Sequence, residues 1–114
     1  MRHFVTTIIL SLLLAACGEA QVKEYRLDVV AEYPHDTESY TQGLFINEGQ
    51  MYESTGVHGK STFRKVDLET GKAIERLDFD KKYFVEGSVI WNGNLYILTW
   101  ESRLAFIYDA ATLE

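Results

Sequence analysis

The sequence repeats itself at a spacing of 44 residues, and this repeat limits the folds that the chain can adopt. Gln42-Gly43 recurs as Glu86-Gly87, so an amide in the first copy is replaced by a carboxylic acid in the second. The same spacing relates three further pairs: Gly49 and Gly93, Tyr52 and Tyr96, and Thr55 and Thr99. A four-strand unit that recurs every 40–45 residues or so is typical of a β-propeller blade. The repeat therefore predicts that Gln42 and Glu86 begin the innermost strands of two neighbouring blades.

Short strands separated by turn residues fill the first copy of the repeat. Alternating and β-prone residues predict strands at 44–46, 51–55, 62–67 and 73–78. Glu69-Thr70-Gly71-Lys72 has the composition of a hairpin turn, with glycine where a positive φ is needed. Residues 25–31 also alternate, which predicts one extra strand before the first copy. After the N-terminal segment no helical period is present, so we expect an all-β fold.

The length of the chain does not match a closed propeller. Propellers have roughly four to eight blades, and even five blades need about 220 residues, whereas this chain has 114. Residues 24–114 are therefore expected to form the N-terminal part of a propeller, about two blades. The alternative is a complete small β domain, which is disfavoured because the second copy ends before a fourth strand.

The first residues have the layout of a signal peptide. A positive start at Arg2 precedes an apolar run over residues 4–14, which is too short to cross a bilayer as a helix. Leu14-Ala15-Ala16-Cys17 resembles the bacterial lipoprotein box, in which the cysteine becomes the lipidated N-terminus. We expect a signal peptide at 1–16, followed by lipidation of Cys17. The alternative is an ordinary secretory signal in which the cysteine is incidental.

This N-terminus also predicts where the protein is located. Residues 17–23 are expected to be a lipidated tether that holds the folded part on the periplasmic side of the cell envelope. Gly18 after the cysteine favours delivery to the outer membrane. If the cysteine is not lipidated, the protein is expected to be periplasmic or secreted.

Composition excludes several classes of function. The net charge is −6 and no basic patch stands out, so nucleic acid is not an expected partner. The only cysteine is Cys17, which leaves no disulfide and no thiol nucleophile in the folded part. The three histidines are too scattered to form a local metal cluster. Glu53 and Glu101 are expected to be solvated residues at strand ends.

Six short blocks of residues stand in a defined order and spacing along the chain. Two of them are Tyr40-Thr41-Gln42-Gly43-Leu44 and Tyr83-Phe84-Val85-Glu86-Gly87. The other four lie at 33–36, 52–56, 64–72 and 98–100. In this order and spacing the blocks resemble the glutaminyl-peptide cyclotransferases of the plant and bacterial type. The resemblance covers about residues 25–114, and the presence of several linked blocks makes it specific.

The resemblance implies a fold and an activity. The family folds as a five-bladed β-propeller and converts the N-terminal glutamine of a peptide into pyroglutamate with release of ammonia. It uses no zinc, and no other cofactor is expected. The expected partners are peptides with N-terminal glutamine, and the protein is expected to be a monomer. Glu86 matches the family's catalytic carboxylate and Gln42 matches an amide of the pocket. The aromatic walls of the pocket are matched by Tyr40, Phe84 and Trp100.

One residue departs from the family pattern. Val85 stands where the family normally has glycine. Glycine reaches backbone angles that a β-branched residue resists. The sequence therefore leaves open how the backbone before Glu86 is arranged.

The chemistry of cyclisation explains why these residue types belong together. A carboxylate beside both nitrogens of the substrate can accept a proton from the attacking amine and donate one to the leaving nitrogen. Aromatic walls favour the folded form of the glutamine side chain, which lowers the entropy still to be lost in ring closure. The competing interpretation is a non-catalytic propeller lipoprotein that binds peptides or acts as a scaffold, since propellers host many functions.

Overall fold

The computed structural model describes residues 22–114, and the predicted signal peptide and Cys17 lie outside them. The chain divides into two units, Met1–Val30 and Ala31–Glu114. Residues 22–30 of the first unit have no regular secondary structure and are exposed. Within residues 22–114 the structure has no helix that could cross a lipid bilayer. All of the strands described below belong to the second unit.

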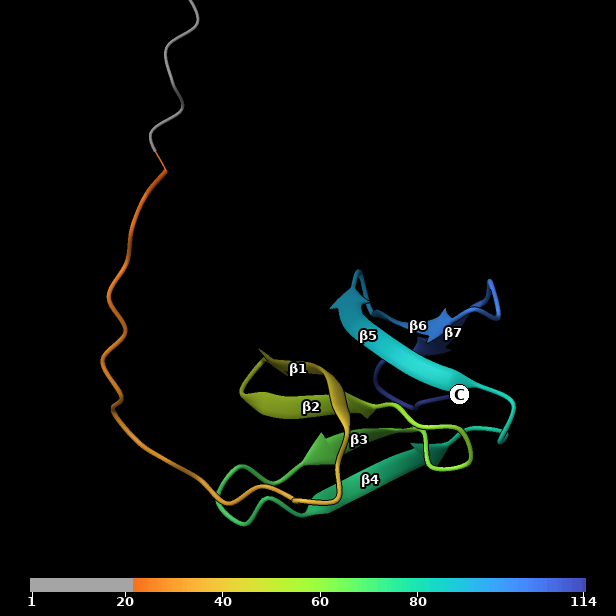
Figure 1. The fold of residues 1–114 in the computed structure, drawn as a ribbon, viewed down its shortest axis with the longest axis horizontal. Coiled ribbons are helices and arrows are strands. Elements are labelled where there is room, and N and C mark those ends of the chain that lie inside the picture. Colours follow the sequence, from red (N-terminus) through yellow and green to blue (C-terminus); the bar gives the residue numbers. More distant parts are fainter. Residues whose placement is uncertain (1–21) are drawn as a thin grey trace, which may run out of the picture. The chain divides into compact units, whose positions relative to one another are not determined.

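Within residues 22–114, seven strands form two antiparallel sheets, which Figure 1 shows. The first sheet has the order β1-β2-β3-β4 and consists of β1 (Thr41–Asn47), β2 (Gln50–Thr55), β3 (Thr62–Val66) and β4 (Ala73–Asp78). The second has the order β5-β6-β7 and consists of β5 (Phe84–Trp91), β6 (Asn94–Trp100) and β7 (Ala105–Asp109). Each sheet is a meander, because sequential strands pair with each other. The predicted all-β fold and the four-strand first repeat are confirmed.

The turns of the two sheets repeat as closely as the strands do. Glu48 and Gly49 join β1 to β2 with φ angles of 50° and 81°, and Asn92 and Gly93 join β5 to β6 with 49° and 78°. Two successive positive φ angles define the type I′ turn, whose twist matches that of a two-strand hairpin. The 44-residue spacing therefore reflects two copies of one hairpin.

The turns after β3 and β7 also share their chemistry. In the first, the carboxylate of Asp67 accepts hydrogen bonds from the backbone and the hydroxyl of Thr70, and in the second, Asp109 binds Thr112 in the same way. These hydrogen bonds lower the pKa of both aspartates, chiefly through the Thr70 hydroxyl at Asp67 and through the Thr112 backbone N–H at Asp109. The predicted hairpin turn at 69–72 is thus confirmed, and its counterpart follows β7.

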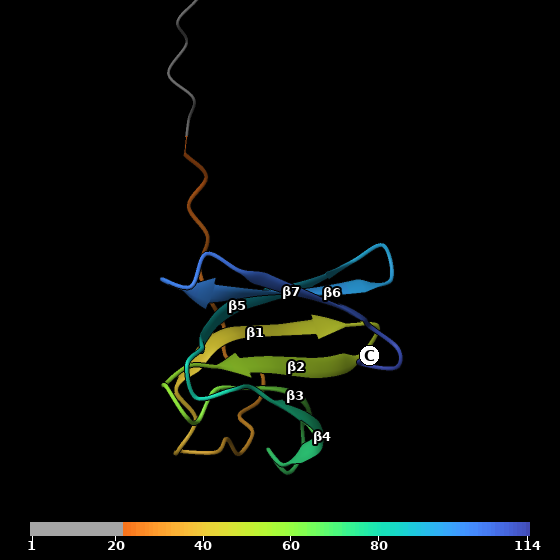
Figure 2. The ribbon, with the colours of Figure 1, turned by 90° about the vertical axis from the view of Figure 1, so that its right-hand side faces the viewer.

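An apolar core joins the two sheets. Five strand residues from both sheets and one residue after β7 form it: Tyr52, Phe63, Val85, Leu95, Ile97 and Leu113. The ring of Tyr52 stacks on those of Phe45 and Phe63, at centroid distances of 5.2 and 5.8 Å. Strand β5 packs against β1 and β2, and Figure 2 shows the second sheet beside the β1 and β2 strands of the first. The first strands of the two repeats therefore lie next to each other, as the repeat predicted.

The strand predicted at 25–31 is wrong. These residues form no strand, and Leu27 and Val30 are 92% and 99% exposed. An alternating pattern specifies the two faces of a strand, but a strand also needs a neighbour that satisfies its backbone hydrogen bonds. The pattern contains no information about that neighbour.

Candidate active site

The five predicted site residues meet in one open pocket of about 460 Å³. Tyr40 precedes β1, Gln42 lies in β1, Phe84 and Glu86 lie in β5, and Trp100 ends β6. Val57, from the loop between β2 and β3, is the sixth lining residue. The pocket is therefore built from both sheets and lies where their first strands meet.

Both polar residues of the pocket lie on β-bulges. In the first sheet Thr41 pairs with Thr55 and Gly43 with Ser54, so Gln42 is an inserted residue. A bulge adds one residue to a strand, disrupts the ladder locally and redirects the side chain. This geometry turns the side chain of Gln42 out of the regular alternation and toward the pocket.

The second sheet repeats this bulge at the matching position. Val85 pairs with Thr99 and Ser88 with Ile97, which leaves Glu86 and Gly87 opposite a single residue of β6. The amide of Gln42 and the carboxylic acid of Glu86 are thus both carried by a β-bulge at equivalent positions of the two repeats. Sequence spacing predicted that the two residues correspond, and the register shows how each reaches the pocket.

Phe84 is the central aromatic side chain of the pocket. Its ring meets Tyr40 edge-to-face at a centroid distance of 6.2 Å and Trp100 at 5.5 Å. Such T-shaped pairs are worth roughly 0.5–1.5 kcal/mol beyond the burial of their area. Tyr40 and Trp100 remain about half exposed, at 58% and 48%. The three rings therefore form a preformed wall with free surface for a ligand.

The loop from Gly56 to Lys60 completes this wall, and sequence reasoning missed its contribution. A Cβ atom on Gly56 would lie 2.4 Å from Cε1 of Phe84, so only glycine allows the ring to approach. His58 packs edge-to-face with the ring of Phe84 at a centroid distance of 5.7 Å. Val57 has a φ of 86°, which is rare for a β-branched residue. Glycines at 56 and 59 are typical of a turn, but the sequence does not show that this turn borders the pocket.

Comparison with known proteins assigns the chain to a family. A family model described as glutamine cyclotransferase matches residues 4–114. The glutaminyl-peptide cyclotransferase of Arabidopsis thaliana is 42% identical over 88 residues, which are 76% of this chain and 28% of that protein. A crystal structure of Myxococcus xanthus glutaminyl cyclase matches with a TM-score of 0.64 and 32% identity, over 74% of this chain and 35% of that one. The chain belongs to the glutamine cyclotransferase family.

Membership in the glutamine cyclotransferase family identifies the two sheets as neighbouring blades of its β-propeller. The first blade has four strands and the second has three. The chain spans about a third of the length of these two relatives, 28% of one and 35% of the other. The pocket is lined by residues of both of these blades.

Val85, which departs from the glutamine cyclotransferase pattern, fits its position without an unusual backbone angle. Its φ is not positive, and its side chain is fully buried in the core between the sheets. Its N–H donates a hydrogen bond to Oγ of Ser61 at 3.1 Å. A β-branched side chain therefore occupies this site as an ordinary strand residue, and Glu86 still reaches the pocket.

Glu53 contradicts the expectation that it is a solvated strand-end residue, because it is only 1% exposed. Its Oε1 accepts a hydrogen bond from Thr41 Oγ1 at 2.6 Å and lies 3.0 Å from His35 Nε2. Its Oε2 accepts a hydrogen bond from a terminal nitrogen of Arg64 at 2.8 Å. The loop before β1 covers this strand, which the alternation within β2 did not reveal. Glu101, by contrast, is exposed as expected.

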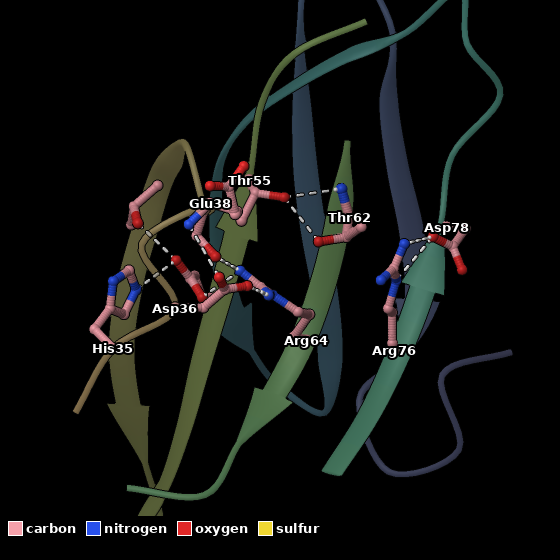
Figure 3. A network of polar contacts seen from close by, with 11 residues as sticks. His35, Asp36, Glu38, Thr55, Thr62, Arg64, Arg76 and Asp78 are labelled. Atoms are coloured by element: carbon pink, nitrogen blue, oxygen red, sulfur yellow. Dashed lines mark hydrogen bonds and ion pairs between the residues drawn. The ribbon is translucent and has the colours of Figure 1, made fainter. Parts of the chain in front are cut away.

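Arg64 connects this buried carboxylate to the loop before β1. Figure 3 shows its guanidinium between β3 and Asp36, to which it donates a hydrogen bond at 2.9 Å. It also donates one to the hydroxyl of Ser39. The hydrogen bond from Arg64, followed by those from the Glu38 backbone and the Ser39 side chain, lowers the pKa of Asp36. The network therefore anchors the segment that leads into Tyr40 and Gln42.

The described part of the chain, residues 22–114, has no group of three His, Cys, Asp or Glu side chains close enough to hold a metal ion. Gln42 and Glu86 supply the side-chain amide and the carboxyl group that line the pocket.

Proposed function

We propose that this protein is a glutaminyl-peptide cyclotransferase, an acyltransferase that converts the N-terminal glutamine of peptides to pyroglutamate and releases ammonia. The observation that carries the proposal is the pocket in which Glu86 and Gln42 lie beside Tyr40, Phe84 and Trp100. Family membership supports it, because the curated Arabidopsis relative has this name. The proposal concerns the full-length protein that contains this sequence.

Glu86 is the proton shuttle in this proposal. The α-amine of the substrate forms a bond to the carbonyl carbon of its own side-chain amide, and the bond from that carbon to the amide nitrogen breaks. The amine gives up one proton to the carboxylate of Glu86, which passes a proton to the leaving nitrogen, so that ammonia departs. The carboxylate ends the cycle as it began, and no other reactant is consumed. General acid–base catalysis of this kind contributes on the order of 10²–10⁴-fold.

The other pocket residues position the substrate. The amide of Gln42 can donate to the substrate carbonyl oxygen or accept from its amine. The rings of Tyr40, Phe84 and Trp100 enclose the methylene groups of the glutamine and favour the folded conformation from which the five-membered ring closes. Since no metal takes part in these steps, chelators are expected to leave the rate unchanged.

The experiment measures ammonia and pyroglutamate released from a glutamine-initiated dipeptide by the full-length protein, with and without a chelator. An asparagine-initiated dipeptide is the matched control, because the same attack would close a strained four-membered ring. Turnover of the first substrate alone supports the proposal. Binding of the glutamine dipeptide without release of ammonia would instead support a peptide-binding scaffold. Loss of activity with the chelator, restored by zinc, would contradict the metal-free mechanism.

We also propose that the protein is anchored to the cell envelope by lipid on Cys17, with the folded part on the periplasmic side. The support is the sequence Leu14-Ala15-Ala16-Cys17, and Gly18 favours the outer membrane. Cys17→Ser is expected to abolish incorporation of labelled fatty acid and to release the protein from membranes. Unchanged labelling in this variant would refute the anchor.

A further inference from the structure

The bulge that presents Glu86 needs support from outside its own sheet. At a bulge the ladder of backbone hydrogen bonds is interrupted, so the extra residue is held less firmly than a paired one. Glu86 and Gly87 lie opposite one residue of β6, between the pairs Val85–Thr99 and Ser88–Ile97. The side chain of Glu86 can be placed reproducibly only if the backbone on both sides of this interruption is fixed.

A serine of the first sheet fixes the carbonyl side of the bulge. The hydroxyl of Ser54, in β2, donates a hydrogen bond to the backbone carbonyl of Glu86 at 2.7 Å and accepts one from the Ser88 hydroxyl at 3.1 Å. Ser54 is fully buried. The approach depends on Gly43, where a Cβ atom would lie 2.6 Å from Ser54 Oγ. This hydrogen bond therefore joins the two sheets at the residue that carries the carboxylate.

A second serine fixes the amide side. Ser61, before β3, accepts a hydrogen bond from the N–H of Val85 at 3.1 Å. Its own hydrogen can be donated to the carbonyl of Val57 at 3.0 Å or that of Tyr83 at 3.2 Å. Ser61 is 2% exposed. The residue before Glu86 is thus tied to the loop that borders the pocket.

We propose that Ser54 and Ser61 are positioning residues that hold the Glu86 bulge in the geometry required for proton transfer. The proposal rests on the proposed cyclotransferase function. Neither serine lines the pocket, so both act through the backbone on either side of Glu86. Their hydroxyls form hydrogen bonds with the backbone of Val85 and Glu86 from outside the second sheet. These hydrogen bonds take the place of those that are missing where the ladder is interrupted.

The proposal predicts a separation of kinetic constants. In Ser54→Ala the carbonyl of Glu86 loses its partner while the aromatic walls and Gln42 stay in place. We expect kcat to fall by about 10-fold to 100-fold with KM changed by no more than about 2-fold, because a misplacement near 1 Å can cost on the order of 10²-fold. Ser61→Ala is expected to act in the same direction. Thr70→Ala, which also removes a hydroxyl hydrogen bond but lies in the exposed turn after β3 and outside the pocket, is the matched control and should retain the wild-type constants.

Amide hydrogen exchange tests the proposal independently of activity. In Ser54→Ala the amides of residues 86–88 are expected to exchange at least about 10-fold faster than in wild type, while amides of β3 and β4 keep their rates. If Ser54→Ala does not fold, Ser61→Ala tests the same bulge from its other side. Folded variants with unchanged exchange at 86–88 and unchanged kcat would overturn the proposal. If the wild-type protein has no cyclase activity, the proposed cyclotransferase function is wrong. Faster exchange at residues 86–88 in Ser54→Ala would then still show that the serine hydrogen bonds hold the bulge.

Discussion

The two sheets carry the same bulge in their first strands, but they hold it in different ways. In the first sheet, Thr41 directly before Gln42 donates to the buried Glu53 of the same sheet. In the second sheet, the backbone of Glu86 is held by Ser54 of the neighbouring sheet. Gln42 is therefore positioned by its own sheet and the loop before it, whereas Glu86 is positioned only when both sheets are packed together.

A second difference lies at equivalent positions of the ladders. In the first sheet Glu53 pairs with Arg64, and at the matching place in the second sheet Ile97 pairs with Phe106. The charged pair is covered by the polar loop before β1, while Ile97 belongs to the apolar core between the sheets. The same strand position can hold a charged or an apolar side chain, depending on which residues cover it.

The largest effect is expected from removing the carboxylate that distinguishes the second bulge from the first. Glu86→Gln makes the two bulges alike, and its amide cannot exchange a proton at neutral pH. Turnover should fall by about 10²–10⁴-fold, with KM close to wild type. Glu101→Gln, exposed and outside the pocket, is the control. A folded Glu86→Gln variant that keeps most of its rate would show that Glu86 is not the shuttle.

The charged pair of the first sheet can be tested by stability. Arg64→Ala leaves the carboxylate of Glu53 buried and without its main cation, which should lower the free energy of unfolding by about 3–5 kcal/mol. The control is Arg76→Ala on β4, whose side chain is 53% exposed and pairs with Asp78, so the loss should stay below about 1 kcal/mol. Urea unfolding measures both. Equal losses in the two variants would mean that burial of the pair does not matter.

Exchanging a residue pair between the sheets tests the same comparison. The double variant Glu53→Ile with Arg64→Phe places the residue pair of the second sheet in the first. Buried ion pairs can often be replaced by apolar residues without loss, so the double variant should be more stable than Arg64→Ala by at least about 1 kcal/mol. Urea unfolding again provides the measurement. A double variant less stable than Arg64→Ala would show that the polar loop before β1 requires a charged partner.

Removing the amide of the first bulge should have a smaller effect than removing the acid of the second. Gln42→Ala deletes a hydrogen-bonding group that positions the substrate and transfers no proton. We expect kcat/KM to fall by about 10-fold, the equivalent of one hydrogen bond, with the loss shared between kcat and KM. Steady-state kinetics with a glutamine-initiated dipeptide give both constants. A loss as large as that of Glu86→Gln would assign Gln42 a role in the chemistry itself.

The smallest effect concerns pH and the loop of the first sheet. Hydrogen bonds from Arg64, then from Glu38 and Ser39, hold the pKa of Asp36 below its usual value of 3.8. A lowered pKa in the folded state means that the stabilisation is present above the unfolded pKa and is lost as pH falls through the folded pKa. Asp36→Asn should therefore be less stable than wild type at pH 7, and the difference should shrink below pH 3.8. Urea midpoints from neutral to acidic pH test this, and a difference independent of pH would contradict it.

The repeat made much of this fold predictable. Corresponding turns, strands and pocket residues follow from pairs such as Gln42 and Glu86, because a repeated unit places equivalent residues at equivalent points. The burial of Glu53 was not predictable, since it depends on a loop that crosses β2 from outside the repeat. The roles of Ser54 and Ser61 were equally hidden, because serines in strands and loops are common and their partners lie more than 20 residues away. The sequence also could not show that Val85 fits, since its environment comes from both sheets.

The pocket has walls from two sheets, which couples ligand binding to the association of those sheets. Phe84 of the second sheet fits over Gly56, in the loop after β2 of the first sheet. Gln42 and Glu86 line the same pocket from the two different sheets. A ligand that contacts both residues binds only the packed arrangement, so mass action makes its binding free energy available to hold the sheets together. Occupancy of the pocket and cohesion of the blades are therefore two measures of one equilibrium.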